Sequence, residues 1–429
     1  TVAAAGPKKR AVPDYSGRGT PPPTVLDRLA WIPRIALFPV RIVTDYGLRA
    51  PIGWLTRTVE TSRSTRKVFS YLFLGPASDT PSIYPVVLYD FGSQPSIGVR
   101  LSWGKGFLTP GSKLTIKLGT GGLDWWRVDT AVRVAYREAF LGLEAGARRQ
   151  PDYRFYGLGP RTQEAAAARY GARRLTAKLS AGGTLNEWGE VAGYASVMNM
   201  TFRSEGFGDD PTIEERVADG QIANLPNGYP GGYATVRAGG VLSVDTRLRK
   251  KRVGSGARLD AKVERVRNMD TTERWTRVEL RGGGALLLDP VGERKLDVKL
   301  EVDFVEPADP RVRIPFLELV SVAGSGHLRG FPSGRLYGES AAALTLDYHW
   351  PIAAWLDAHA HLGAGNVFGP HLSGFSAGAM RASAGFGVSL AGLTEERFIE
   401  LSTSIGTAPL DQGLDVTSFR LLLGFTNDY

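Results

Sequence analysis

The stretch KLDVKLEVDF, residues 295–304, alternates charged and apolar side chains without interruption. Because successive side chains of a β-strand point to opposite faces of the sheet, its five apolar residues share one face and its five charged residues share the other. The same split recurs in 125–136, 174–180 and 276–281. This pattern is typical of a transmembrane β-barrel strand, but a soluble β-sandwich with one wet face alternates in the same way.

The number of such strands decides between the two architectures. We predict sixteen strands, which run to the last residues of the chain without the helices of a second domain. An even number of roughly ten-residue strands is typical of an outer-membrane β-barrel, whose closure exposes no sheet edge to hydrocarbon. The predicted strands lie near 84–91, 95–104, 112–120, 125–136, 139–149, 170–183, 189–203, 232–247, 256–267, 273–287, 294–305, 339–349, 355–367, 378–390, 396–405 and 416–425.

The composition excludes several classes of site. The 429 residues include no Cys, so neither a disulfide framework nor a thiolate metal site can form, which suits a bacterial envelope protein. The net charge of +9 is weak evidence for an anionic partner, because acidic and basic residues interleave, and we expect no nucleic acid. No run of about 18 apolar residues occurs, so we expect no transmembrane helix. A start at Thr1 without a signal peptide is consistent with a processed, exported protein.

The first 80 residues differ in character from the rest. Residues 1–23 are rich in Pro, Lys and Arg and are expected to form a disordered arm. Residues 24–80 are expected to be an amphipathic, basic helical segment that Pro33 and Pro39 kink or break. Such segments often lie in a membrane interface, although a helix pair on a soluble core has the same pattern. We leave the periplasm, the interface and the barrel lumen open for this segment, and the barrel itself is expected over 81–429.

Two connections between predicted strands are unusually long, near 204–231 and 306–338. The second contains HLRGFPSGRLYGES, residues 327–340, whose LRGF resembles the Val/Ile-Arg-Gly-Phe/Tyr motif of the BamA/TamA-like outer-membrane assembly superfamily, also called the bacterial surface antigen family. Other stretches similar to that family are LDYHWP at 346–351, GNVF at 365–368, the terminal-strand signal FRLLLG at 419–424 and, more weakly, DYRFYGLG at 152–159.

The resemblance implies a sixteen-stranded barrel whose sixth extracellular loop folds back inside, between strands eleven and twelve. In the family, the loop Arg forms salt bridges with carboxylates on strands twelve and thirteen. Asp347 matches the first carboxylate, whereas Gly363 stands at the second position, and Asp357 on the same face lies about 20 Å away along the strand. The implied site residues are Leu328, Arg329, Gly330 and Phe331 of the loop, Asp347 as partner, and Phe419, Leu421, Leu423, Gly424 and Phe425 of the seam-forming terminal strand.

Other patterns carry less weight, and we expect no catalytic residue, no metal and no cofactor. The sequence GFSAG around Ser376 spells a nucleophile elbow, but no His follows it, as a hydrolase triad requires. His359 and His361 share a strand face, yet we expect the His residues to line the lumen, because a metal site needs further ligands. Trp and Tyr residues are expected to form interfacial belts. Those named for this role are Trp125, Trp126, Tyr136, Tyr153, Tyr156, Trp275, Tyr348 and Trp350.

The family usually carries POTRA domains ahead of the barrel, and the first 80 residues lack their pattern, so the chain resembles a member without POTRA domains. Three functions follow as hypotheses: a protein insertase or translocase of the bacterial outer membrane, a structural barrel that anchors an envelope complex, and a passive pore. No covalent chemistry is implied. Outer-membrane lipids, either lipopolysaccharide or phospholipid, are expected partners, and other envelope proteins are candidates to bind residues 1–80.

Overall fold

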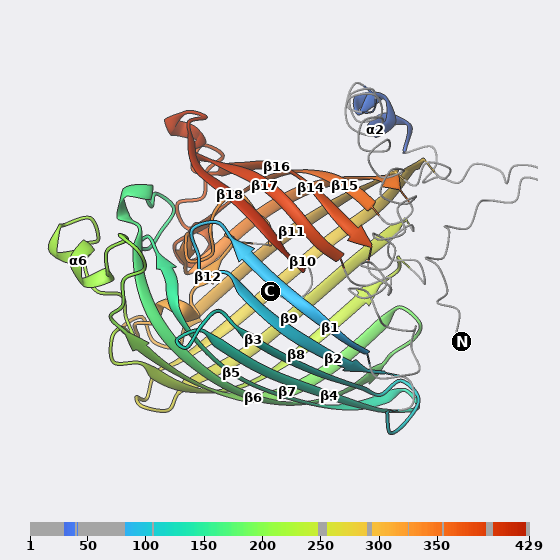
Figure 1. Ribbon diagram of the computed structural model, residues 1–429, viewed down its shortest axis with the longest axis horizontal. Helices are drawn as coiled ribbons and strands as arrows, with labels where there is room; N and C mark the ends of the chain where they lie inside the picture. Colours follow the sequence, from blue (N-terminus) through green and yellow to red (C-terminus); the bar gives the residue numbers. More distant parts are fainter. Residues whose placement is uncertain are drawn as a thin grey trace, which may run out of the picture.

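The computed structural model describes residues 30–38, 41, 82–104, 107–247, 255–289, 294–324, 326–353, 356–391 and 398–425. Sixteen antiparallel strands close into one barrel, in which the first strand, β1, meets the last, β18 (Figure 1). The predicted barrel and its strand number are therefore confirmed. The strands are β1 (Ser82–Asp90), β2 (Ser96–Trp103), β3 (Lys113–Thr120), β4 (Trp126–Tyr136), β5 (Ala139–Phe155), β6 (Ala168–Thr184), β7 (Gly189–Arg203), β8 (Tyr233–Asp245), β9 (Gly256–Asn268), β10 (Arg274–Asp289), β11 (Arg294–Pro307), β14 (Ser340–Ala353), β15 (Leu356–Phe368), β16 (Arg381–Ala391), β17 (Phe398–Pro409) and β18 (Val416–Phe425).

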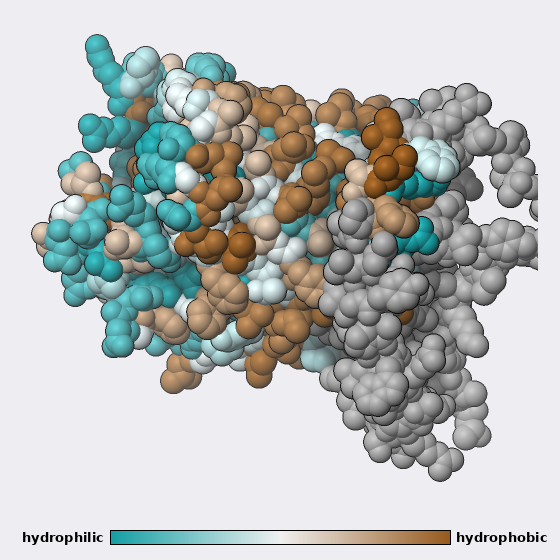
Figure 2. Space-filling view, turned by 90° about the horizontal axis from the view of Figure 1, so that it is seen from above, coloured by the Kyte–Doolittle hydropathy of each residue, from teal (hydrophilic) through white to brown (hydrophobic). Residues whose placement is uncertain are grey.

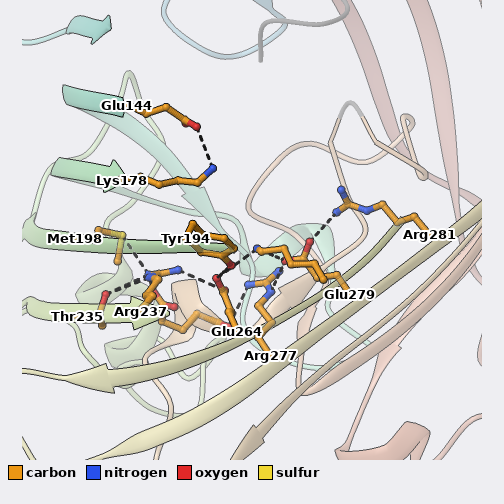
Figure 3. A network of polar contacts seen from close by, with 12 residues as sticks. Glu144, Lys178, Tyr194, Met198, Thr235, Arg237, Glu264, Arg277, Glu279 and Arg281 are labelled. Atoms are coloured by element: carbon orange, nitrogen blue, oxygen red, sulfur yellow. Dashed lines mark hydrogen bonds and ion pairs between the residues drawn. The ribbon is translucent and has the colours of Figure 1, made fainter. Parts of the chain in front are cut away.

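The two faces of the wall differ as the alternation predicts. In β11, Leu300 is 50% exposed on the outside, whereas its neighbour Glu301 is buried inside. Figure 2 shows hydrophobic side chains around the wall and hydrophilic ones gathered at one end. Inside, charged side chains pair across strands: Lys262 Nζ lies 2.9 Å from Glu279 Oε1, in the network of Figure 3. An apolar outside and an ion-paired inside are what a bilayer requires of a barrel wall.

The long connections lie at one end of the barrel, the loop end. The connection 204–232 carries the helix α6 (Ile213–Ala218), which Thr212 and Glu215 cap reciprocally. The connection 308–339 carries the 3₁₀ turn η3 (Phe316–Glu318) and two short paired strands, β12 (Val320–Ser321) and β13 (Tyr337–Gly338). Three further 3₁₀ turns are η2 (Glu164–Ala166), η4 (Pro370–Leu372) and η5 (Leu410–Gln412). We call the opposite end, where β4 turns into β5, the turn end.

The helix α2 (Trp31–Ala36) lies on the outside of the barrel, beside the turn-end parts of β14 and β15 (Figure 1). Ala30, at its start, is fully buried in a cluster with Leu288 of β10 and Trp350 of β14, and Arg34 Nε donates a hydrogen bond to the Leu288 carbonyl. Because Trp350 shares the outer face of β14, this contact places α2 against the outer wall. Within the described residues, no helix has the length and hydropathy that a membrane-spanning helix requires.

The predicted break at Pro33 is wrong: α2 begins at Trp31, so Pro33 lies in the first turn, where its missing N–H would have had no partner within the helix. Residues 1–29, Pro39 and most of 24–80 lie outside the described residues. The disordered arm and the remainder of the helical segment therefore stay predictions.

The interfacial-belt prediction is wrong for three aromatic residues. Trp275 is 1% exposed and belongs to a cluster inside the barrel, and Tyr153 packs against the same cluster. Tyr156 is buried, and the Arg335 guanidinium carbon lies 5.2 Å from the centre of its ring. The reason is that the connection 308–339 folds into the lumen and supplies an apolar partner there.

Candidate functional site

The base of the connection 308–339 is anchored in an aromatic cluster on the lumen side of β5–β8. The fully buried ring of Phe316 lies 5.1 Å from that of Phe155, 5.6 Å from that of Tyr170 and 5.6 Å from that of Phe202. Such edge-to-face and tilted ring pairs add to the free energy of burying the rings. Beside the cluster, Glu318 Oε1 lies 2.6 Å from Arg237 Nη2. The loop is therefore held to the wall by both ring packing and an ion pair.

The tip of the loop, LRGF at 328–331, reaches the opposite side of the lumen. Leu328 and Phe331 are fully buried. The backbone N–H of Gly330 donates a 2.8 Å hydrogen bond to Ser383 Oγ on β16. A Cβ at Gly330 would collide with the backbone carbonyl of Ile405 on β17, so only glycine permits this approach.

Arg329 meets Asp347 of β14 in a two-point contact. Arg329 Nη1 lies 3.2 Å from Asp347 Oδ1, and Nη2 lies 3.3 Å from Oδ2. Asp347 is fully buried, and Lys299 Nζ of β11 lies 2.9 Å from its Oδ2. Stripping a carboxylate of water costs several kcal/mol unless cations and hydrogen bonds replace it. The planar fork of Arg329 sets the orientation of the loop as well as its depth.

The second family carboxylate has no counterpart at Gly363, and the structure gives a steric reason. A Cβ there would stand 2.8 Å from the His327 carbonyl oxygen and 3.3 Å from Leu328 Cδ2. A carboxylate side chain at this position would occupy the volume that the loop fills. Asp357 stands opposite Pro351, near the turn end of β15, six residues from Gly363.

Histidines line the lumen on both sides of the Arg329 contact. His349 Nε2 lies 3.3 Å from Asp297 Oδ2, and His359 Nε2 lies 3.3 Å from Glu400 Oε1. The ring of His359 lies between those of His349 and His361, at centroid distances of 5.7 Å and 6.2 Å. In the part of the chain that the structure describes, no three His, Asp or Glu side chains are grouped so as to hold a metal ion. His349 and His359 are thus partners of lumen carboxylates, whereas His361 Nε2 lies 3.3 Å from Ser404 Oγ.

Two arginines that the sequence analysis did not identify enclose Phe331. The guanidinium carbons of Arg335 and Arg381 lie 5.3 Å and 5.7 Å from the centre of its ring. Such cation–π contacts strengthen when water is excluded, and these arginines are 1% and 2% exposed. Both reach the connection 156–167: Arg381 Nη2 donates to the Thr162 carbonyl at 2.8 Å, and Arg335 Nη1 donates to Glu164 at 2.6 Å.

Burial lowers the pKa of the Arg335 guanidinium, while the charge of Glu164 opposes that shift. In the sequence, the position of Arg335 directly after Gly334 in the quoted stretch is the one signal that could have singled it out, and the structure gives that glycine a φ of +96°. Nothing in the period-two pattern distinguishes Arg381, the first residue of β16.

The described part of the seam between β1 and β18 is short: β18 is described to Phe425, and in the register of Tyr89 with Leu423 that residue stands opposite Val87, so the described seam covers only residues 87–90 of β1. Among the described residues, the ladder joins Tyr89 with Leu423 and Asp90 with Leu422, and the Phe91 N–H donates a 2.9 Å hydrogen bond to the Leu421 carbonyl just beyond it, whereas β17 and β18 pair over nearly their whole length. A bidentate ion pair closes one end of the seam, with Arg420 Nε 2.9 Å from Asp90 Oδ1 and Nη2 2.8 Å from Oδ2.

The expected terminal-strand residues all lie in β18. Phe419 is 55% exposed on the outside, and its ring lies 6.2 Å from that of Phe91. A Cβ at Gly424 would stand 2.9 Å from Leu88 Cδ1, so the glycine lets β1 approach closely. The members of this set are Phe419, Leu421, Leu423, Gly424 and Phe425. The loop tip contacts β16 and β17, so it lies within one strand of the seam.

No family model and no curated protein matches this sequence. Among solved structures, the barrel is similar to BamA from Haemophilus ducreyi lacking POTRA domains 1–3, with a TM-score of 0.56 and 16% identity over 81% of this chain and 70% of that one. It is also similar to CdiB from Acinetobacter baumannii, with a TM-score of 0.50 and 12% identity over 80% of this chain and 59% of CdiB. The chain therefore has the fold of the BamA/TamA-like outer-membrane barrels that its sequence resembles.

Proposed function

We propose that this protein lies in the bacterial outer membrane and assists the insertion or translocation of proteins, or lipids, there. The loop end would face the cell surface and the turn end the periplasm. The short ladder between the described parts of β1 and β18 is the single observation that carries this proposal. No covalent chemistry is part of it.

The seam has the properties of an edge that a substrate strand could join. Each backbone hydrogen bond contributes a net of about 0.5–1.5 kcal/mol, so the described part of the seam, with two ladder positions and the Phe91–Leu421 hydrogen bond, costs less to part than the described ladder between any other neighbouring strands. An exposed strand edge accepts an extended chain by adding it to the sheet. The buried Arg329–Asp347 contact and the caged Phe331 would keep the lumen loop and β14–β17 rigid while the seam opens.

A disulfide lock tests the proposal, because the chain has no Cys of its own. Tyr89→Cys with Leu423→Cys joins β1 to β18 at a directly opposed pair, whose Cα spacing of about 4.5–5.5 Å suits a disulfide. The matched control, Leu401→Cys with Leu423→Cys, joins β17 to β18 instead. Both variants would be reconstituted in vesicles with a urea-denatured eight-stranded barrel as substrate, and its folding followed by heat-resistant gel mobility.

Oxidation should slow substrate folding at least tenfold in the seam lock, reduction should restore it, and the control should be unaffected. Equal folding rates for the oxidised seam lock and the wild type would contradict the proposal. Undiminished assembly of other outer-membrane proteins in depleted cells would contradict it as well.

A structural anchor of an envelope complex is the second candidate. The position of α2 on the outer wall at the turn end favours it, because residues at that end would be accessible to periplasmic partners. Normal barrel assembly, together with loss of a co-purifying complex on deletion of 1–80, would support the anchor. A passive pore is disfavoured by the buried loop tip, and large, steady openings of the intact protein in planar bilayers would reverse that judgement.

A further inference from the structure

Three arginines form a compact cluster on the outer wall at the loop end. Arg265 and Arg267 lie near the end of β9, and Arg274 begins β10 directly opposite Arg267 in the ladder. All three are exposed. They share the outer face of the strands with Val263 and Leu280, which are 51% and 42% exposed. Directly opposed residues of an antiparallel pair have Cβ atoms about 5 Å apart, so the guanidinium groups can converge on one ligand.

The cluster carries uncompensated positive charge. No described carboxylate lies within ion-pair distance of Arg265, Arg267 or Arg274. The carboxylates of the nearest turn, 269–273, bind other groups than these arginines. Asp270 Oδ2 accepts a 2.7 Å hydrogen bond from the Ala234 N–H, and Glu273 Oε2 accepts one of 3.0 Å from Thr271 Oγ1.

The inner faces of the same two strands are arranged differently. There Arg277 Nε lies 2.9 Å from Glu279 Oε1 (Figure 3), and Arg281 Nη2 lies 3.1 Å from Glu301 Oε1 of the neighbouring strand β11. On the inner faces of β9 and β10, the cations are thus matched with carboxylates. Like charges directly opposite one another destabilise a strand pair, so the outer Arg267–Arg274 pair is unfavourable unless an anion from outside the chain bridges it.

We propose that Arg265, Arg267 and Arg274 bind the phosphate groups of a phosphorylated glycolipid, of the lipid A type, in the leaflet at the loop end. The cluster lies at the border of the apolar wall, next to Val236, which is 39% exposed, so a bound phosphate would sit where headgroups meet hydrocarbon. The arginine fork matches the phosphate oxygens in pairs. The site rests on the proposed outer-membrane orientation, but it is independent of any insertion activity.

The test uses the full chain in nanodiscs and measures the binding of fluorescent lipid A. The variant is R265Q/R267Q/R274Q. The matched control is R149Q/R161Q/R203Q, which removes the same charge at the same end. Its three arginines are already paired, with Asp124 at 2.6 Å, Asp411 at 2.6 Å and Glu205 at 2.9 Å. Heat-resistant gel mobility reports whether each variant is folded, and R267Q alone replaces the triple variant if that one does not fold.

The triple variant should bind lipid A about 100-fold more weakly, since each arginine near a lipid surface contributes roughly fivefold, and R267Q alone should lose about fivefold. The control should bind as the wild type does. Lipid A stripped of its phosphates should bind the wild type as weakly as intact lipid A binds the triple variant, and millimolar inorganic phosphate should not displace intact lipid A. Equal affinities of variant and control, or tight binding of the stripped lipid, would overturn the site. Because the assay involves no protein substrate, its outcome is separate from that of the seam lock.

Discussion

Arg329 and Asp347 form a buried, two-point ion pair inside the barrel, with Nη–Oδ distances of 3.2 Å and 3.3 Å, and Lys299 completes it from the adjacent strand at 2.9 Å. The pair joins the tip of a long loop to the wall, so loop position and wall stability are coupled. Asp347 contacts two cations, Arg329 and Lys299. The loss of Asp347 therefore leaves more charge unpaired than the loss of Arg329.

Removing either side chain of the pair should therefore have unequal effects. Arg329→Ala leaves Asp347 with Lys299 and should lower the free energy of unfolding by about 1–3 kcal/mol. Asp347→Ala leaves two cations without their acceptor and should cost about 3–5 kcal/mol. The temperature at which heat-resistant gel mobility is lost measures both. Unchanged mobility of Arg329→Ala, or a smaller effect of Asp347→Ala, would count against this pair as the lock.

A methyl group at Gly330 should displace the loop tip. Gly330→Ala places a Cβ against the Ile405 carbonyl, and overpacking of this kind costs about 1–3 kcal/mol. We expect larger single-channel conductance and faster proteolysis within 308–339. Gly326→Ala is the matched control, because no heavy atom lies within 4 Å of the Cβ position there. Identical conductance of the two variants would show that the tip does not obstruct the lumen.

The Arg420–Asp90 ion pair should limit opening of the seam. Arg420→Ala removes a bidentate contact with Nε–Oδ1 at 2.9 Å, beside the two ladder positions of the described seam. Hydrogen exchange of β1 should rise about tenfold, while β9 stays protected. Arg281→Ala, which removes an ion pair between the fully paired β10 and β11, serves as control. Equal exchange of β1 in both variants would exclude this role.

The helix α2 should lie in the leaflet at the turn end. Ile35 is 65% exposed and Trp31 61% exposed on the side of α2 away from the barrel, while Ala30 is fully buried against it. Apolar side chains beside a transmembrane wall gain free energy by entering the interface. A fluorophore on Ile35→Cys should be quenched by spin-labelled lipid and shielded from iodide. The same fluorophore on Leu123→Cys, 97% exposed, should behave oppositely, and iodide access at both would contradict the prediction.

The sequence by itself determined the wall of the barrel, through the alternation of apolar and charged residues along each strand. The alternation in KLDVKLEVDF holds because successive strand residues face opposite sides regardless of what surrounds them, and repeating it along the chain predicted both the barrel and its strand number. Pro33 shows where this reasoning stops, since its effect depends on where α2 begins. The resemblance at LRGF pointed to Arg329 and Asp347, which the structure brings into contact.

The tertiary structure alone decided which distant groups meet. Arg335 and Arg381 converge on Phe331, and both donate to the Thr162 carbonyl, because two loops fold into the same lumen, and no periodicity predicts that. The glycine at position 363 is explained only by the tertiary structure as well, because the loop packs against it and leaves no room for a side chain. The short described β1–β18 seam and the opposed Arg267 and Arg274 depend on register and barrel closure. Register and closure are properties of paired strands. The sequence of one strand predicts which of its residues face inward, but not how its partner is aligned with it.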